Sequence, residues 1–265
     1  MVAGVPPDYF TATGQLWGNP LYRWEAHRSE SYAWWIKRMK ATLRLVDRAR
    51  LDHFRGFAAY WEVPADAVTA EAGRWVAGPG ADLLVALERG LGGLPLIAED
   101  LGDITPDVFE LRDLFDLPGM AVLQFAFGAT EDDFLPHSLI RHCVVYTGTH
   151  DNPTVAEWYA GAPAAERAFF ASYRGPGSGS VPWDAIRMAW ASVAALAVTT
   201  PQDLLGQGEE GRINYPGRED GNWTWRLPAR FFRADARRLA RRLRRLGILF
   251  ARTPTDEKPE LPAAG

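Results

Sequence analysis

The chain has 265 residues, of which 47% are hydrophobic, with 29 basic and 33 acidic side chains and a net charge of -4. This length and apolar content predict a full hydrophobic core, and the mild net charge argues against nucleic acid as a partner. No apolar run approaches the roughly 20 residues of a membrane span, and the lone Cys143 excludes a disulfide framework, so we expect a soluble, cytoplasmic protein without a membrane partner.

The first part of the chain is predicted to open with a long loop. Glycines and prolines interrupt any period in residues 1–28, although this segment also carries five aromatic rings. Residues 29–46 have helical spacing behind a serine cap in Ser29–Ser31. A short strand that ends near Asp52 is expected next.

Strand-like and helix-like segments then alternate along the chain. The intervals between strands are about 30 residues or slightly less, which is typical of βα units and a parallel sheet. We predict helices at 81–91, from Thr105 onward and at 183–198, and strands at 94–98, 120–127 and 144–147.

The end of the chain has a distinct composition. Residues 174–181 are rich in glycine and serine and predict a surface loop. Residues 230–245 are dense in arginine, with Leu239, Leu243 and Leu246 on one side. This pattern predicts an amphipathic helix with a solvated basic face.

Acidic residues follow three of the predicted strands. Asp52 comes two positions after Arg50, so both side chains leave the same face of an extended segment. Glu99 follows strand 94–98, and His150 and Asp151 follow strand 144–147. One such residue alone is more often a helix cap or an ion-pair partner. The ordered set instead indicates a (β/α) barrel active site, in which paired carboxylates cleave a glycosidic bond.

Six stretches of the sequence together resemble the C-terminal half of the 4-alpha-glucanotransferases, the amylomaltase or disproportionating-enzyme family related to the alpha-amylases. They occur in the family's order and extend from residue 4 to about residue 227. The matching stretches are Gly4–Phe10, Gly14–Pro20, Arg50–Gly56, Ala98–Gly102, Gly148–Asn152 and Gln202–Gly206.

The resemblance implies a role for each acidic residue. Asp52 would be the nucleophile of a retaining double displacement, Glu99 the general acid/base, and Asp151 the third carboxylate, which holds sugar hydroxyls together with His150. Arg50 would favour the charged form of Asp52 and orient it. The transfer of α-1,4-glucan segments between maltodextrins is the implied reaction.

An aromatic segment bears on whether transfer or hydrolysis follows. Transfer requires a bound acceptor sugar and exclusion of water. In the family a loop at residues 4–20 closes over the acceptor end, and the residues expected to contact sugar there are Tyr9, Phe10, Gln15, Trp17 and Asn19. Alternatively these rings only fasten the loop to the barrel. For His53, a sugar contact and a packing role remain alternatives.

The number of residues before Arg50 is small for this fold. A barrel has eight strands, the family's nucleophile ends the fourth, and three preceding βα units need roughly 90 residues. Only 49 residues precede Arg50. We therefore expect an incomplete (β/α)8 TIM barrel, with strands four to eight in residues 1–228, a basic helix at 229–252 and a flexible tail at 253–265. The missing N-terminal half would be a partner.

Two other functions remain open at this stage. The chain could be an alpha-glucan hydrolase of the amylase type, or a maltodextrin-binding fragment without activity. No cofactor and no metal are expected, because the sequence has neither a phosphate-binding glycine loop nor a cluster of metal ligands.

Overall fold

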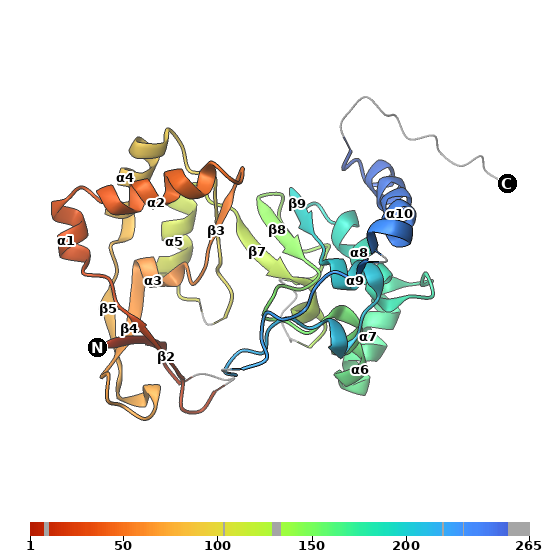
Figure 1. Cartoon of the computed structure of the whole chain (residues 1–265), viewed down its shortest axis with the longest axis horizontal. Helices are drawn as coiled ribbons and strands as arrows, with labels where there is room; N and C mark the ends of the chain where they lie inside the picture. Colours follow the sequence, from red (N-terminus) through yellow and green to blue (C-terminus); the bar gives the residue numbers. More distant parts are fainter. Residues whose placement is uncertain (8–10, 103, 129–133, 219, 230, 254–265) are drawn as a thin grey trace. The chain divides into compact units, whose positions relative to one another are not determined.

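The computed structural model describes residues 1–7, 11–102, 104–128, 134–218, 220–229 and 231–253 (Figure 1). The chain divides into two compact units, Met1–Met120 and Ala121–Gly265, and each contains both helices and strands. The α/β class predicted from the sequence is therefore confirmed. Within the described ranges, no helix combines the length and the apolar character that crossing a bilayer requires.

An antiparallel sheet opens the first unit, so the prediction of a loop over residues 1–28 is wrong. This segment forms two strands and a short helix, and two later strands complete a sheet of order β2-β1-β4-β5. The elements are β1 (Val2–Val5), β2 (Gln15–Pro20), α1 (Trp24–Ser29), β4 (Ala59–Val63) and β5 (Arg74–Ala77).

Two glycines that led to the loop prediction instead allow neighbouring strands to approach closely. A Cβ on Gly4 would stand 2.6 Å from the carbonyl oxygen of Gln15 on the neighbouring strand. Gly14 has a φ of +68°, and a Cβ there would overlap the Val5 carbonyl oxygen. The other neighbour of β1 is β4, which is far away in sequence, so local patterns do not predict the pairing of β1 with β4.

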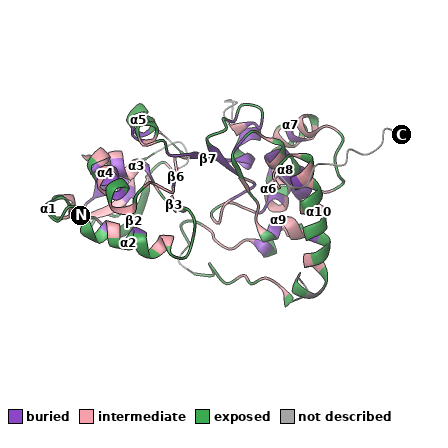
Figure 2. Cartoon of the chain, turned by 90° about the horizontal axis from the view of Figure 1, so that it is seen from above, coloured by how far each residue is buried: buried purple, intermediate pink, exposed green. Residues whose placement is uncertain are grey.

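The rest of the first unit is built around two parallel strands. Strand β3 pairs with β6, and Arg50 lies opposite Ile97 and Leu51 opposite Ala98. Leucines of α4 and β6 form the centre of the core, and Figure 2 shows the buried positions of α4 in purple. The elements are α2 (Ala33–Leu43), β3 (Ala49–Leu51), α3 (Arg55–Ala58), α4 (Gly80–Leu91), β6 (Leu96–Ala98) and α5 (Pro106–Leu114).

Most of the local predictions for this region are confirmed. Helix α4 ends at Gly92, which has a φ of +79°, and α5 begins with Pro106 in its first turn. The predicted serine cap is wrong, because α2 begins after Tyr32, which adopts a left-handed conformation and makes no side-chain cap hydrogen bond.

A second sheet, of order β7-β8-β9, forms the core of the second unit. Strands β8 and β9 are parallel, with Val145 opposite Ala197. Helix α6 begins with a capping box, in which Thr154 and Glu157 satisfy each other's backbone amides. The elements are β7 (Gly119–Val122), β8 (Cys143–Tyr146), α6 (Val155–Gly161), α7 (Ala164–Arg174), α8 (Val181–Ala191), β9 (Leu196–Val198) and α9 (Pro201–Leu205).

Two predicted elements of this unit are too long. The strand expected at 120–127 stops at Val122 and continues as a 3-10 helix, Leu123–Phe127. The helix expected at 183–198 stops at Ala191, and its last residues form β9 instead. Arg252 stabilises this break by donating hydrogen bonds to the carbonyl oxygens of Trp190, Ser192 and Ala194 at 2.7–2.9 Å.

The predicted basic helix is present as α10 (Ala236–Leu249), preceded by a π-helical turn at Phe231–Asp235. Leu239 is buried against Trp183 and Ile186 of α8. The guanidinium of Arg242 lies 3.8 Å from the centre of the Trp183 ring. The exposed face of α10, green in Figure 2, carries most of its arginines, as expected for a peripheral helix.

Gly14 and Gly18 allow a matched test of the antiparallel sheet. Both have a positive φ, but a Cβ on Gly18 would meet no atom within 4 Å. Gly18→Ala should therefore cost only the left-handed strain of about 1–2 kcal/mol. Gly14→Ala adds overlap with the β1 backbone, and its free energy of unfolding should fall by about 1–2 kcal/mol more. Equal losses in urea unfolding would contradict this arrangement.

Candidate active site

Two carboxylates follow adjacent parallel strands in the first unit. Since Leu51 and Ala98 are register partners, the next residues, Asp52 and Glu99, lie at the same edge of the sheet. The pairing continues past the strands: the Glu99 amide donates to the Leu51 carbonyl at 3.0 Å, and the Phe54 amide donates to the Glu99 carbonyl at 3.1 Å. The backbone therefore fixes the relative position of Asp52 and Glu99.

The Glu99 side chain is half-buried and accepts two backbone hydrogen bonds. One oxygen accepts from the His53 amide at 2.7 Å, and the other from the Leu101 amide at 3.0 Å. Burial raises the pKa of the Glu99 carboxyl and the Asp52 charge adds to the rise, while the two amides and Arg50 oppose it. Glu99 therefore keeps a proton to higher pH than an ordinary glutamate, as a general acid must.

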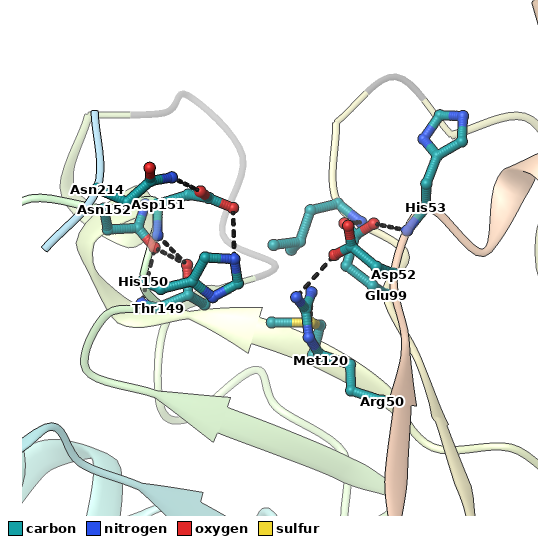
Figure 3. A network of polar contacts seen from close by, with 11 residues as sticks. Arg50, Asp52, His53, Glu99, Met120, Thr149, His150, Asp151, Asn152 and Asn214 are labelled. Atoms are coloured by element: carbon teal, nitrogen blue, oxygen red, sulfur yellow. Dashed lines mark hydrogen bonds and ion pairs between the residues drawn. The ribbon is translucent and has the colours of Figure 1, made fainter. Parts of the chain in front are cut away.

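Asp52 is exposed and paired with Arg50 (Figure 3). The distance from Arg50 Nη2 to Asp52 Oδ1 is 2.7 Å, and 70% of the Asp52 side chain is accessible. The other terminal nitrogen of Arg50 lies 4.0 Å from Met120 Sδ. Because a solvated ion pair contributes little stability, its main effect is to fix the direction of the carboxylate.

His53 is packed and neutral. Its φ is +49°, and its ring meets Trp17 edge-on, with 4.8 Å between the ring centres. Burial lowers the pKa of His53 to about 4, with Arg55 adding to the decrease and Asp52 opposing it. The observed contact is the packing role; the sugar contact remains a prediction.

Three of the predicted acceptor residues, Gln15, Trp17 and Asn19, lie on β2. The Trp17 indole donates to Gln15 Oε1 at 3.1 Å. Trp17 and Asn19 line a hollow of about 590 Å³ that Asp52 also lines. Tyr9 and Phe10 lie outside the described residues.

A second polar cluster, within the second unit, follows β8. Its loop, Gly148–Asn152, is closed by its own side chains: the amide and the hydroxyl of Thr149 donate to Asn152 Oδ1 at 2.9 and 2.8 Å. The amide of Asp151 donates to Thr149 Oγ1 at 3.2 Å. These bonds hold His150 and Asp151 at the tip of a tight turn.

Both oxygens of Asp151 have partners, although 47% of its side chain is exposed. Oδ1 accepts from Asn214 Nδ2 at 2.6 Å, and Oδ2 lies 3.1 Å from His150 Nε2 (Figure 3). The His150 ring is 5.3 Å from the Trp223 ring. A hollow of about 330 Å³ beside this cluster is lined by His150, Asn152, Trp223 and Trp225. Indole faces are suitable platforms for sugar rings.

Several of these contacts cannot be found by scanning for carboxylates. Asn214 is far from Asp151 in sequence, and only the tertiary fold joins them. Trp223 and Trp225 could have been noticed as an aromatic pair in a glycine-containing segment. In the described ranges, no group of three or more His, Cys, Asp and Glu side chains is arranged to hold a metal ion.

The family model described as 4-alpha-glucanotransferase, glycoside hydrolase family 77, matches residues 1–231. The chain belongs to the 4-alpha-glucanotransferase family. A 4-alpha-glucanotransferase of Thermus thermophilus is 52% identical over 236 residues, which are 86% of this chain and 47% of that protein. The chloroplastic/amyloplastic DPE1 of Arabidopsis thaliana is 48% identical over 86% of this chain and 40% of its own length.

Solved structures agree with this family. An amylomaltase from Streptococcus agalactiae, in complex with acarbose, superposes with a TM-score of 0.88 at 33% identity, over 94% of this chain and 50% of that chain. An amylomaltase from Corynebacterium glutamicum shares the fold, with a TM-score of 0.70 at 22% identity. The chain thus spans about half the length of the 4-alpha-glucanotransferases that it matches.

The low pKa of His53 predicts a pH-dependent stability. Its folded-state pKa of about 4 lies below the ordinary 6.5, so between these values the unfolded chain binds a proton that the folded chain does not. The contribution of neutral His53 should be complete above about pH 6.5 and should decline as the pH falls toward 4. Urea unfolding of the wild type and of His53→Gln across this range should give a difference that changes with pH, because the other groups cancel. A constant difference would contradict the burial of a neutral ring.

Proposed function

We propose that this chain carries the catalytic carboxylates and part of the sugar groove of a 4-alpha-glucanotransferase that acts on maltodextrins. The main support is the pair of carboxylates at the ends of β3 and β6. Asp52 is exposed and paired with Arg50, whereas Glu99 is half-buried with a raised pKa. Two carboxyl groups in different surroundings suit a nucleophile and a proton donor.

The first half-reaction transfers the donor glucan to the protein. The Asp52 carboxylate attacks the anomeric carbon, and the Glu99 carboxyl gives its proton to the departing glycosidic oxygen. The glycosidic bond breaks as the glucosyl ester forms on Asp52, and the shortened chain leaves with the proton. Glu99 is then a carboxylate.

The second half-reaction returns the glucan to an acceptor. The Glu99 carboxylate takes the proton of an acceptor hydroxyl, whose oxygen attacks the anomeric carbon and displaces Asp52. Two inversions retain the original configuration. Asp151 and His150 are assigned to the sugar hydroxyls from the family resemblance.

Two residues of β2 support transfer over hydrolysis. Trp17 and Asn19 line the same hollow as Asp52, so an acceptor sugar bound on the indole face would displace water near the ester. Tyr9 and Phe10 are assigned to the same role from the resemblance. Membership of the 4-alpha-glucanotransferase family supports transfer over amylase-type hydrolysis.

We further propose that β3, β6, β7, β8 and β9 are five strands of a (β/α)8 barrel whose other strands come from the remaining half of a family-length protein. Among the described strands, β3 pairs only with β6 and β9 only with β8. Leu196 and Val198 of β9 are each 41% exposed, although parallel strands are normally covered on both faces. Added strands would cover them.

Covalent trapping tests the assigned roles. Since Asp52 should form the ester, a 5-fluoroglucosyl donor should label Asp52 when the chain is assembled with the first half of the Thermus thermophilus relative. In the same assembly, Glu99→Gln cannot exchange a proton, so turnover of maltotriose should fall about 10²- to 10⁴-fold. With an activated donor, whose leaving group needs no proton, azide should partly rescue the deglycosylation step. Label on Glu99 or Asp151, or near-normal turnover of the Gln variant, would overturn the assignment.

Mixing tests the requirement for added strands. Maltotriose incubated with the chain and the first half of the Thermus thermophilus relative should give a ladder of longer maltodextrins plus glucose. The chain alone should be far slower, because small displacements of reacting groups cost orders of magnitude in rate. The same mixture with Asp52→Asn is the control for activity of the added half. A chain that is equally active alone would contradict the proposal.

A further inference from the structure

One buried amide joins the two ends of the loop that carries His150 and Asp151. Gln124, in the 3-10 helix after β7, has an exposure of 5%. Its Nε2 donates to the carbonyl oxygen of Thr147 at 3.1 Å and to that of Pro153 at 2.9 Å. Thr147 and Pro153 immediately flank the loop Gly148–Asn152.

The partners determine the orientation of this amide. Both are carbonyl oxygens, which only accept hydrogen bonds, so the NH₂ group and not the oxygen of Gln124 must face them. One NH₂ group has two hydrogens and satisfies both carbonyls. A single side chain therefore bridges the two ends of the loop.

The first residue of the loop, Gly148, lies close to the Gln124 amide. A Cβ on Gly148 would stand 2.7 Å from Gln124 Nε2 and 3.4 Å from the Pro153 carbonyl oxygen. A glycine at this position therefore leaves space for the amide. A larger residue would have to displace Gln124 or widen the loop.

Asp203 is a second buried side chain that binds residues on both sides of the loop. This carboxylate, 1% exposed, accepts from Thr147 Oγ1 at 2.6 Å and from the Val155 amide at 2.8 Å. Burial raises the pKa of Asp203, while the Thr147, Val155 and Thr200 hydrogen bonds oppose the rise. The residues on either side of the loop are thus tied to buried polar groups.

The tip of the loop is exposed and is held by polar contacts. The side chains of His150 and Asp151 are 34% and 47% exposed, and Asn214 donates to Asp151. Hydrogen bonds between Thr149 and Asn152 close the tip, while Gln124 and Asp203 bind its two ends. An apolar side chain in place of Gln124 would fill the same space but would leave the Thr147 and Pro153 carbonyls without their donor, which costs free energy of folding. The two hydrogen bonds of Gln124 therefore indicate a role in holding the loop.

We propose that Gln124 is a positioning residue that sets the geometry of the His150–Asp151 loop for sugar binding. That the loop binds sugar rests on the proposed function. That Gln124 holds the loop rests on its two hydrogen bonds alone. Gln124 is not assigned any contact with sugar. It acts through the Thr147 and Pro153 carbonyls.

Gln124→Met tests the proposal, because methionine has a similar length and no donor. Hydrogen exchange of the Thr149 and Asp151 amides, both hydrogen-bonded within the loop, should accelerate about tenfold relative to the wild type. Ile186→Val is the matched control, since this buried residue belongs to the cluster of Trp183 and Leu239 and makes no hydrogen bond to the loop carbonyls. It should leave the loop amides unchanged relative to the rest of the unit.

Sugar binding supplies the second measurement. With acarbose as the probe, calorimetry should show a Kd about tenfold or more weaker for Gln124→Met than for the wild type, because misplaced polar groups bind poorly. Gly148→Ala alters the same contact from the loop side. The double variant should therefore lose less affinity than the sum of the single variants, whereas Gln124→Met and Ile186→Val should add.

The outcomes separate the two proposals. Unchanged exchange of the loop amides in Gln124→Met, or acceleration spread evenly over the second unit, would overturn the role of Gln124. Additive losses in the Gln124→Met and Gly148→Ala pair would also overturn it. If the wild-type chain binds no acarbose, alone or with the added half, the proposed function fails. The exchange comparison still decides whether Gln124 positions the loop.

Discussion

The parallel pairing of β3 with β6 is the constraint on which the candidate site depends. It places Leu51 opposite Ala98, so that Asp52 and Glu99 leave the sheet together at its C-terminal edge. A shift of one residue would turn every side chain of β3 to the other face. The core beneath prevents such a shift, because Leu51, Leu96 and Ala98 are buried with the leucines of α4. Packing of apolar side chains therefore determines where the charged ones meet.

The difference between the two carboxylates arises just beyond the strands. Asp52 extends into solvent beside Arg50, while Glu99 folds back onto the amides of His53 and Leu101. Backbone amides stabilise the charged form of Glu99, yet desolvation outweighs them and the pKa rises. The left-handed turn at His53 presents one of these amides, which explains why a strained backbone occurs beside the site.

The second unit positions its polar loop in a different way. The side chains of His150 and Asp151 are partly exposed, and buried polar groups bind both ends of their loop. Gln124 and Asp203 are both almost fully buried, where an unsatisfied hydrogen-bonding group would be costly. In the observed arrangement of the loop, Gln124 and Asp203 both have hydrogen-bond partners at the two loop ends.

The sequence by itself determined the local features: the strands before Asp52 and Glu99, the glycine that ends α4, and the arginine-rich amphipathic helix all follow from short-range patterns. Carboxylates after strands also indicated the site, and the ordered motifs indicated the family. Only the tertiary structure decided that residues 1–28 form a sheet with β4, and that Arg252 binds the carbonyls where α8 ends. Only it joined Asn214 to Asp151 and Gln124 to the loop ends. Each of these contacts links residues far apart in the chain, and its hydrogen bonds form only after folding has brought the partners together, so no local period records them.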